Sequence, residues 1–132
     1  MAMTFEQTAA RRVRYLRERL GWSQQDLADR LRNLGAPLDR AGIARLETGK
    51  RGITLDETMR LAYALNVAPV HLMIDTEDEA ERMQPVPGAE VSPAEARKWV
   101  RGEMPLLFQD PRAYLMNVPR AEFERTTRGD DN

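Results

Sequence analysis

The sequence predicts an all-α fold, and three observations support this prediction. Apolar residues recur every three or four positions through most of the chain, as they do on one face of a helix. Helix-capping residues precede these segments, and glycine or proline follows them. No stretch alternates apolar and polar residues between hairpin turns, so no strand is expected.

The first two helices have clear beginnings and ends in the sequence. The first is expected from Thr4 to Leu20, where Gly21 ends it because glycine adopts positive φ without steric cost. Ser23 is a good N-cap for the second helix, since its hydroxyl can accept a free backbone N–H. Gly35 and Pro37 then stop that helix.

Three more helices complete the predicted N-terminal domain. Asp39 caps a short third helix. Thr54 and Glu57 have the spacing of a capping box and open the fourth. Pro69 suits the first turn of a fifth helix, because that position needs no backbone donor. Residues 4–74 are therefore predicted to form one domain of five helices.

The remainder of the chain divides into a linker and a C-terminal segment. Residues 75–91 are acidic at first and then contain proline and glycine, so a mobile linker outside the core is expected. Residues 92–126 are expected to be helical, with starts near Ser92, Asp110 and Pro119.

The C-terminal segment is too apolar to be a free tail. It contains Trp99 and several other large apolar residues, whereas disordered segments are poor in them. It is also too short to build a sound core alone. It must cover its apolar face with its own N-terminal domain, a second copy or a different protein. We expect self-association into a homodimer, with part of the segment folding back on its own domain.

Composition argues against several classes of function. The chain has no cysteine, which excludes disulfides, cysteine zinc sites and thiol catalysis. Its single histidine, His71, has no neighbouring ligands, so no metal site is expected. No catalytic motif or cofactor-binding loop is present, so we expect neither an enzyme nor a cofactor. With no membrane-length apolar run and no secretory signal, a cytoplasmic location without membrane association is expected.

The net charge of −1 conceals two halves of opposite sign. Residues 1–74 carry 12 basic and 8 acidic side chains, a net charge of +4. Residues 75–132 carry 8 basic and 13 acidic side chains, a net charge of −5. A basic domain is the electrostatic footprint expected for contact with nucleic-acid phosphates.

Three sequence blocks carry a resemblance to a known family. Residues 21–28 read GWSQQDLA, residues 43–51 read IARLETGKR, and residues 54–67 carry the matching apolar pattern of a later helix. In this order, the blocks resemble the Cro/repressor-type, or XRE, family of helix-turn-helix proteins. The resemblance implies a five-helix lambda-repressor-like domain, and sequence-specific binding of double-stranded DNA by a bacterial transcriptional regulator.

The resemblance also implies a set of contact residues. It places residues 39–47 as the recognition helix in the major groove. Arg40, in the first turn, could bond bidentately to guanine, while Lys50 and Arg51 would contact phosphates. The implied DNA-binding residues are Gln24, Arg40, Ala41, Gly42, Ala44, Arg45, Lys50 and Arg51. The resemblance further implies a structural salt bridge between Arg17 and Glu47.

The sequence departs from the family pattern between the second and third helices. The distance from Leu27 to Ile43 is longer than usual, which predicts an enlarged turn at residues 35–38. Asp39 replaces the usual Ser or Thr cap. Gly42 is unusual inside a helix, where it costs about 1 kcal/mol relative to alanine. Either DNA approaches the backbone closely at Gly42, or a neighbouring helix needs the space.

Two other functions remain open on the sequence alone. The chain could be an antitoxin, with the same DNA-binding domain and a C-terminal segment that binds a partner toxin. It could also be an interaction module that has lost DNA binding, although Arg40 and the basic charge of the domain argue against this.

Overall fold

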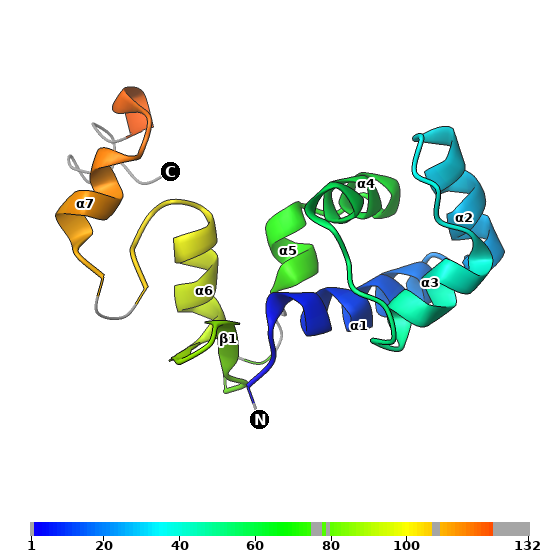
Figure 1. Cartoon of the computed structure of the whole chain (residues 1–132), viewed down its shortest axis with the longest axis horizontal. Coiled ribbons are helices and arrows are strands. Elements are labelled where there is room, and N and C mark those ends of the chain that lie inside the picture. Colours follow the sequence, from blue (N-terminus) through cyan, green and yellow to red (C-terminus); the bar gives the residue numbers. More distant parts are fainter. Residues whose placement is uncertain (1, 75–77, 79, 107–108, 123–132) are drawn as a thin grey trace.

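The computed structural model describes residues 2–74, 78, 80–106 and 109–122 of the chain. The helices in these residues are α1 (Phe5–Arg19), α2 (Gln24–Asn33), α3 (Arg40–Glu47), α4 (Leu55–Leu65), α5 (Pro69–Met73), α6 (Pro93–Val100) and α7 (Pro111–Met116), and residues 120–122 are also helical. The strands are β1 (Met83–Val86) and β2 (Ala89–Val91). Figure 1 shows an elongated molecule with α1–α5 gathered at one end and α6 and α7 at the other. The chain is mainly helical, as the sequence predicts.

Local capping signals set where the N-terminal helices begin. The Ser23 and Thr54 hydroxyls accept hydrogen bonds from backbone N–H groups of α2 and α4. In turn, the side chains of Asp26 and Glu57 accept hydrogen bonds from the backbone N–H groups of Ser23 and Thr54. Asp39 caps α3 by accepting the N–H of Gly42 at 2.8 Å. These polar groups satisfy donors that the first turn of a helix leaves free.

The first core lies among α1–α5 and includes the turn between α2 and α3. Gly35 has a φ of +73°, which lets the chain leave α2 sharply. The turn then buries Ala36 and Leu38, which are 3% and 5% exposed, beside Leu31 and Ile43. The enlarged turn is therefore part of the core, and its packing helps to fix α2 against α3.

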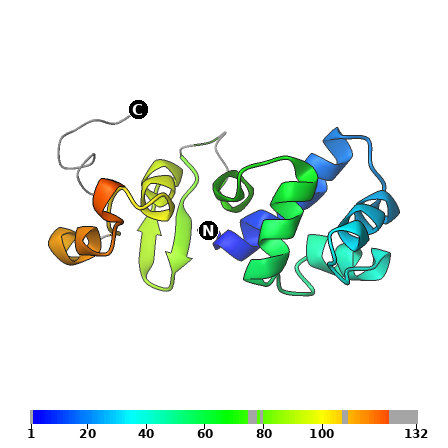
Figure 2. The same cartoon turned by 90° about the horizontal axis from the view of Figure 1, so that it is seen from above.

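The prediction that the chain contains no strand is wrong at residues 83–91. β1 and β2 pair in an antiparallel hairpin around Gly88, whose φ is +85° (Figure 2). Met83 and Val91 are each 1% exposed, so this part of the expected linker lies in a core. The strands are too short to show alternation, and proline, read as a loop signal, is tolerated at a sheet edge. Of the acidic stretch before the hairpin, residues 75–77 and 79 lie outside the described residues.

A second core joins the hairpin and α6 to the N-terminal domain. It contains Ile74, Met83, Val91, Ala96 and Leu106, with partly buried side chains packed around it. Two of those side chains lie far apart in the sequence: the rings of Phe5 and Trp99 are 6.2 Å apart. Part of the C-terminal segment thus folds back on its own domain.

The N-terminal residues pair with the hairpin beside the second core. Met3 forms an isolated parallel bridge to Met83. Its backbone N–H donates to the Arg82 carbonyl, and its carbonyl accepts a hydrogen bond from the backbone N–H of Gln84. α7 is attached more loosely, through the Tyr114 hydroxyl, which donates to the Trp99 carbonyl at 2.9 Å. Burial raises the pKa of the Tyr114 hydroxyl.

Within the described residues, no helix combines the length and apolar character needed to cross a membrane.

Candidate nucleic-acid interface

A buried ion pair ties α1 to α3 behind the candidate interface. The Arg17 guanidinium donates to both carboxylate oxygens of Glu47, at 2.7 and 2.9 Å, and to the Trp22 carbonyl at 2.8 Å. The side chains of Arg17 and Glu47 are only 9% and 2% exposed. The hydrogen bonds to Glu47 raise the pKa of Arg17. The structure thus brings together the two residues for which the sequence predicts a salt bridge.

Gln24 belongs to the same cluster. Its side-chain amide donates to Glu47 at 3.1 Å from the first turn of α2, and the residue is half-buried. Glu47 therefore accepts hydrogen bonds from two other elements, α1 and the start of α2. This arrangement holds the α2 N-terminus beside α3 and orients the amide whose contact with DNA the sequence predicts.

The two faces of α3 differ sharply in burial. Ile43 and Leu46 are fully buried and anchor the helix to the core. The opposite face carries Ala41 and Arg45, which are exposed, and Ala44, which is half-buried. The outer face of α3 thus carries short side chains between two exposed arginines, Arg40 and Arg45.

The space around Gly42 is occupied by the turn and the helix cap. A Cβ atom on Gly42 would lie 3.1 Å from both a carboxylate oxygen of Asp39 and a methyl carbon of Leu38. Both neighbours belong to the turn that precedes α3, so no neighbouring helix needs this space, contrary to one of the two alternatives drawn from the sequence. Gly42 is half-buried, and a close approach of DNA to its backbone stays a prediction.

Lys50 and Arg51, both expected at phosphates, differ in their surroundings. Lys50 is exposed, and its backbone N–H donates to the Arg45 carbonyl at 2.9 Å, which fixes the loop onto the end of α3. Arg51 is half-buried and donates to both oxygens of Glu57, at 3.0 and 2.6 Å. Arg51 thus fastens the loop to the N-terminus of α4, which favours a positioning role over direct phosphate contact.

The Arg51–Glu57 pair predicts a specific pH dependence of stability. Hydrogen bonds from Arg51, and then from the Thr54 backbone, lower the pKa of Glu57 below its ordinary value of 4.5. Because the folded state binds this proton less readily than the unfolded state, the stabilisation is complete above that value and disappears as the pH falls below it. Glu57→Gln should therefore flatten the loss of stability between about pH 4.5 and 3 in urea titrations.

The matched control for this prediction is Arg51→Leu, which removes the main cause of the shift while leaving Glu57 able to ionise. It should flatten the same part of the profile, and the double variant should add little to either single change. Profiles parallel to that of the unchanged chain would contradict the assignment.

One contact near the interface was not foreseen from the sequence. The Arg30 guanidinium lies 3.9 Å above the centre of the Trp22 ring, where a cation–π interaction is favourable. It connects α2 to the residue before its cap and covers one side of the indole. The sequence signal for this contact is weak, because Trp22 lies in the loop before α2 and its distance from Arg30 is set only by the fold.

The described residues contain no group of three or more potential metal ligands. His71 lies in α5, where its carbonyl accepts a hydrogen bond from Arg12 at 3.3 Å.

Comparison with known proteins supports the interpretation of α1–α5 as a helix-turn-helix domain. A family model described as Helix-turn-helix matches residues 13–72, from the middle of α1 into α5. No curated protein and no solved structure matches the chain. The matched region contains the paired helices α2 and α3, the turn between them and the helices that support them. Residues 13–72 are therefore a helix-turn-helix DNA-binding domain of the Cro/repressor type, the XRE family.

Proposed function

We propose that the protein regulates transcription by binding specific sequences in duplex DNA, with α3 in the major groove. One observation carries the proposal. Residues 2–74, all of which the structure describes, contain 12 basic side chains. Only three of these side chains have no hydrogen bond, ion pair or ring contact with any described residue. Those three are Arg40, Arg45 and Lys50.

The other nine basic side chains are engaged within the protein. Their partners are carboxylates, backbone carbonyls, a tyrosine hydroxyl or an aromatic ring. The free cations lie together on α3 and the loop after it, whereas the other nine each have a partner within the protein. Because unpaired cations grouped on an exposed helix attract an anionic ligand, this distribution favours DNA over a protein partner.

Each free cation is suited to a different contact. Arg40 begins α3, where a guanidinium could reach guanine O6 and N7. Arg45 lies beside the short side chains of Ala41 and Ala44, which could meet a thymine methyl group. Lys50 follows the helix and is placed for the phosphate backbone.

The experiment that tests the function is selection from a pool of random DNA duplexes with the full chain. The expected result is enrichment of one short sequence, bound at least 1,000-fold more tightly than a shuffled duplex at physiological salt. A pool that stays random after repeated rounds would contradict sequence-specific binding.

Lys50→Ala should weaken binding to the selected and shuffled duplexes alike. Removal of one phosphate contact lowers the slope of log affinity against log salt by about 0.9. The measurement is a salt titration of both duplexes, with Lys98→Ala as control, because Lys98 is an exposed lysine on α6 in the other half of the molecule. Equal slopes for Lys50→Ala and the unchanged chain would remove Lys50 from the interface.

The antitoxin alternative is supported by one feature, the exposure of α7. No described residue of this helix is buried, and Met116 is 81% exposed. Leu115 and Val118 are half-buried beside it. We therefore retain α7 as the candidate docking element for a partner protein. Co-expression with the product of an adjacent gene tests it, because an antitoxin should relieve growth arrest and Met116→Asp should abolish that relief.

A further inference from the structure

A pocket lies between α6 and the chain that follows it. It has a volume of about 310 Å³, and its lining residues are Val91, Glu95, Lys98, Met104, Pro105 and Leu106. Here it is called the α6 pocket. Because sites for small molecules usually have volumes of about 300–1,000 Å³, the α6 pocket is large enough for a ligand the size of an amino acid.

The fold builds this pocket where α6 ends. Gly102 has a φ of +77°, and the backbone N–H of Glu103 donates to the Lys98 carbonyl at 2.8 Å. This left-handed ending turns the chain back beside the helix. The backbone N–H of Leu106 then donates to the side chain of Gln109 at 2.9 Å, which fixes the returning segment.

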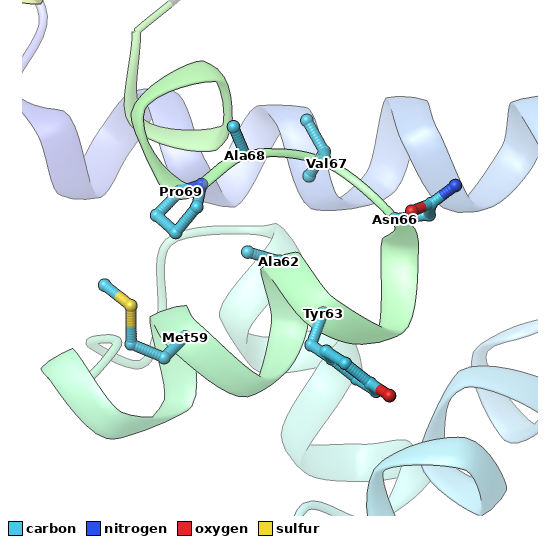
Figure 3. A pocket seen from close by; sticks show the side chains of 7 residues that line it. All are labelled: Met59, Ala62, Tyr63, Asn66, Val67, Ala68 and Pro69. Carbon is cyan, nitrogen blue, oxygen red and sulfur yellow. The ribbon is translucent and has the colours of Figure 1, made fainter.

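The α6 pocket has a buried apolar floor. Val91 and Leu106 belong to the second core and are only 1% and 7% exposed, while Met104, which is 51% exposed, forms part of the wall. A larger hollow of about 660 Å³ lies between α4 and the start of α5 (Figure 3). None of its seven lining residues is charged, and two of them, Met59 and Tyr63, are 41% and 76% exposed. Of the two, only the α6 pocket combines a buried floor with charged groups.

Two side chains of opposite charge lie at the rim of the α6 pocket. Glu95 and Lys98 are three positions apart on α6, so they share one face of the helix, with Cβ atoms about 5–6 Å apart. Both are exposed, and neither side chain has a hydrogen bond or ion pair with any described residue. Acid–base pairs at similar spacing on α1, α2 and α4 do form ion pairs, at 3.0–3.4 Å. Glu95 and Lys98 are therefore available to a ligand.

We propose that the α6 pocket binds a free α-amino acid with an apolar side chain. The ammonium group of the ligand donates to the Glu95 carboxylate, and its carboxylate accepts from the Lys98 ammonium group. The apolar side chain enters the pocket above Val91 and Leu106. Both charges of an amino acid are attached to its Cα atom, so they lie as close together as the positions of Glu95 and Lys98 require. The two hydrogen bonds are charge-assisted, and such bonds are stronger than neutral ones.

Ligands with a single charge fit this rim less well. A fatty acid would bring its carboxylate beside Glu95, and an apolar amine would bring its cation beside Lys98. Like charges placed together in a binding site are unfavourable. A zwitterion avoids both repulsions and pairs with both rim residues.

This inference goes beyond the proposed function and does not depend on it. Figure 1 shows α6 and α3 in opposite halves of the molecule, so a bound amino acid leaves Arg40, Arg45 and Lys50 available to DNA. The affinity should be modest, with a dissociation constant of roughly 10 μM–1 mM, because so small a ligand forms few contacts.

Isothermal titration calorimetry of the full chain with leucine, methionine and phenylalanine tests the proposal. At least one should bind with a dissociation constant below about 1 mM, and alanine should bind at least about tenfold more weakly because it lacks a large apolar side chain. The N-acetyl and amide derivatives of the best ligand each lack one charge and should bind at least about fivefold more weakly. The proposal is overturned if none of the three amino acids binds, or if either derivative binds as well as its parent.

Two variants assign the charges of the ligand to the rim residues. Lys98→Met should weaken binding of the free amino acid at least about fivefold but leave binding of its amide unchanged, since the amide has no carboxylate. Glu95→Gln should weaken the free amino acid similarly and leave the N-acetyl derivative unchanged. Both residues are exposed, so neither change should disturb the fold, and circular dichroism checks this. Unchanged affinity of either variant for the free amino acid would overturn the proposal.

Met104→Asp tests the apolar wall of the pocket. A carboxylate at this position should lower the affinity at least about tenfold, because binding would bury it beside an apolar side chain. The matched control is Val86→Asp, since Val86 is 44% exposed on β1 and does not line the pocket. Equal affinities of these two variants would place the ligand elsewhere and overturn the proposal. If the chain binds no duplex specifically, the proposed function fails, while these titrations still decide the use of the α6 pocket.

Discussion

Replacing Glu47 by alanine should lower the free energy of unfolding by about 3–5 kcal/mol. The change leaves the Arg17 guanidinium buried without its carboxylate, and the desolvation cost of that charge is then not offset. It also removes the acceptor for Gln24, so the contact between α3 and the start of α2 is weakened at the same time. A large effect is expected because one carboxylate accepts hydrogen bonds from two other elements.

Urea denaturation followed by circular dichroism measures this loss. The matched control is Asp29→Ala, because Asp29 pairs with Arg32 on the surface of α2, away from Arg17, with side chains 53% and 70% exposed. That change should cost no more than about 0.5 kcal/mol, as is usual for surface pairs. If the urea midpoint of Glu47→Ala shifts no further than that of the control variant, the pair of Arg17 and Glu47 contributes little to stability.

The N-terminal helices could be predicted because their signals are local. Ser23 and Thr54 cap α2 and α4 through bonds to residues three positions away, and such bonds depend on little besides the local chain. The helix expected at residues 39–47 forms from Arg40 to Glu47 with Asp39 as its cap. Apolar spacing then identifies which face of each helix is buried.

The hairpin and the second core could not be predicted, because they depend on contacts between distant residues. Met3 pairs with Met83, and Phe5 packs near Trp99, across most of the length of the chain. No local pattern signals such pairs, and the strands contain too few residues to show their period.

Side-chain partners at the interface were equally hard to foresee. The resemblance gives Lys50 and Arg51 the same expected contact with phosphates, yet of these two only Arg51 hydrogen-bonds to a carboxylate, that of Glu57. The distinction depends on how the loop after α3 meets the N-terminus of α4, which is a property of the folded domain. Gln24 is a further example, because its bond to Glu47 requires α2 and α3 to be packed together.

Arg40→Ala should weaken binding to the selected DNA sequence by about 1–3 kcal/mol, or roughly 5- to 150-fold. Arg40 is exposed in the first turn of α3 and has no partner among the described residues, so its guanidinium is free to form two hydrogen bonds with one guanine. Loss of those bonds should also relax the preference at a single base pair in each half-site. Titration of duplexes mutated at every position measures both effects.

Two further variants separate base recognition from simple charge. Arg40→Lys keeps the positive charge but not the planar guanidinium group. Relative to Arg40→Ala, it should restore the affinity for shuffled DNA but little of the preference for the selected sequence. Lys50→Ala should lower affinity without changing the preference at any position, because phosphate contacts carry no direct sequence information. If Arg40→Ala lowers the affinity for every duplex by the same factor, as expected for Lys50→Ala, then Arg40 contacts the DNA backbone and does not read a base. Another residue of α3 would then read the base, and Arg45 is the first to examine.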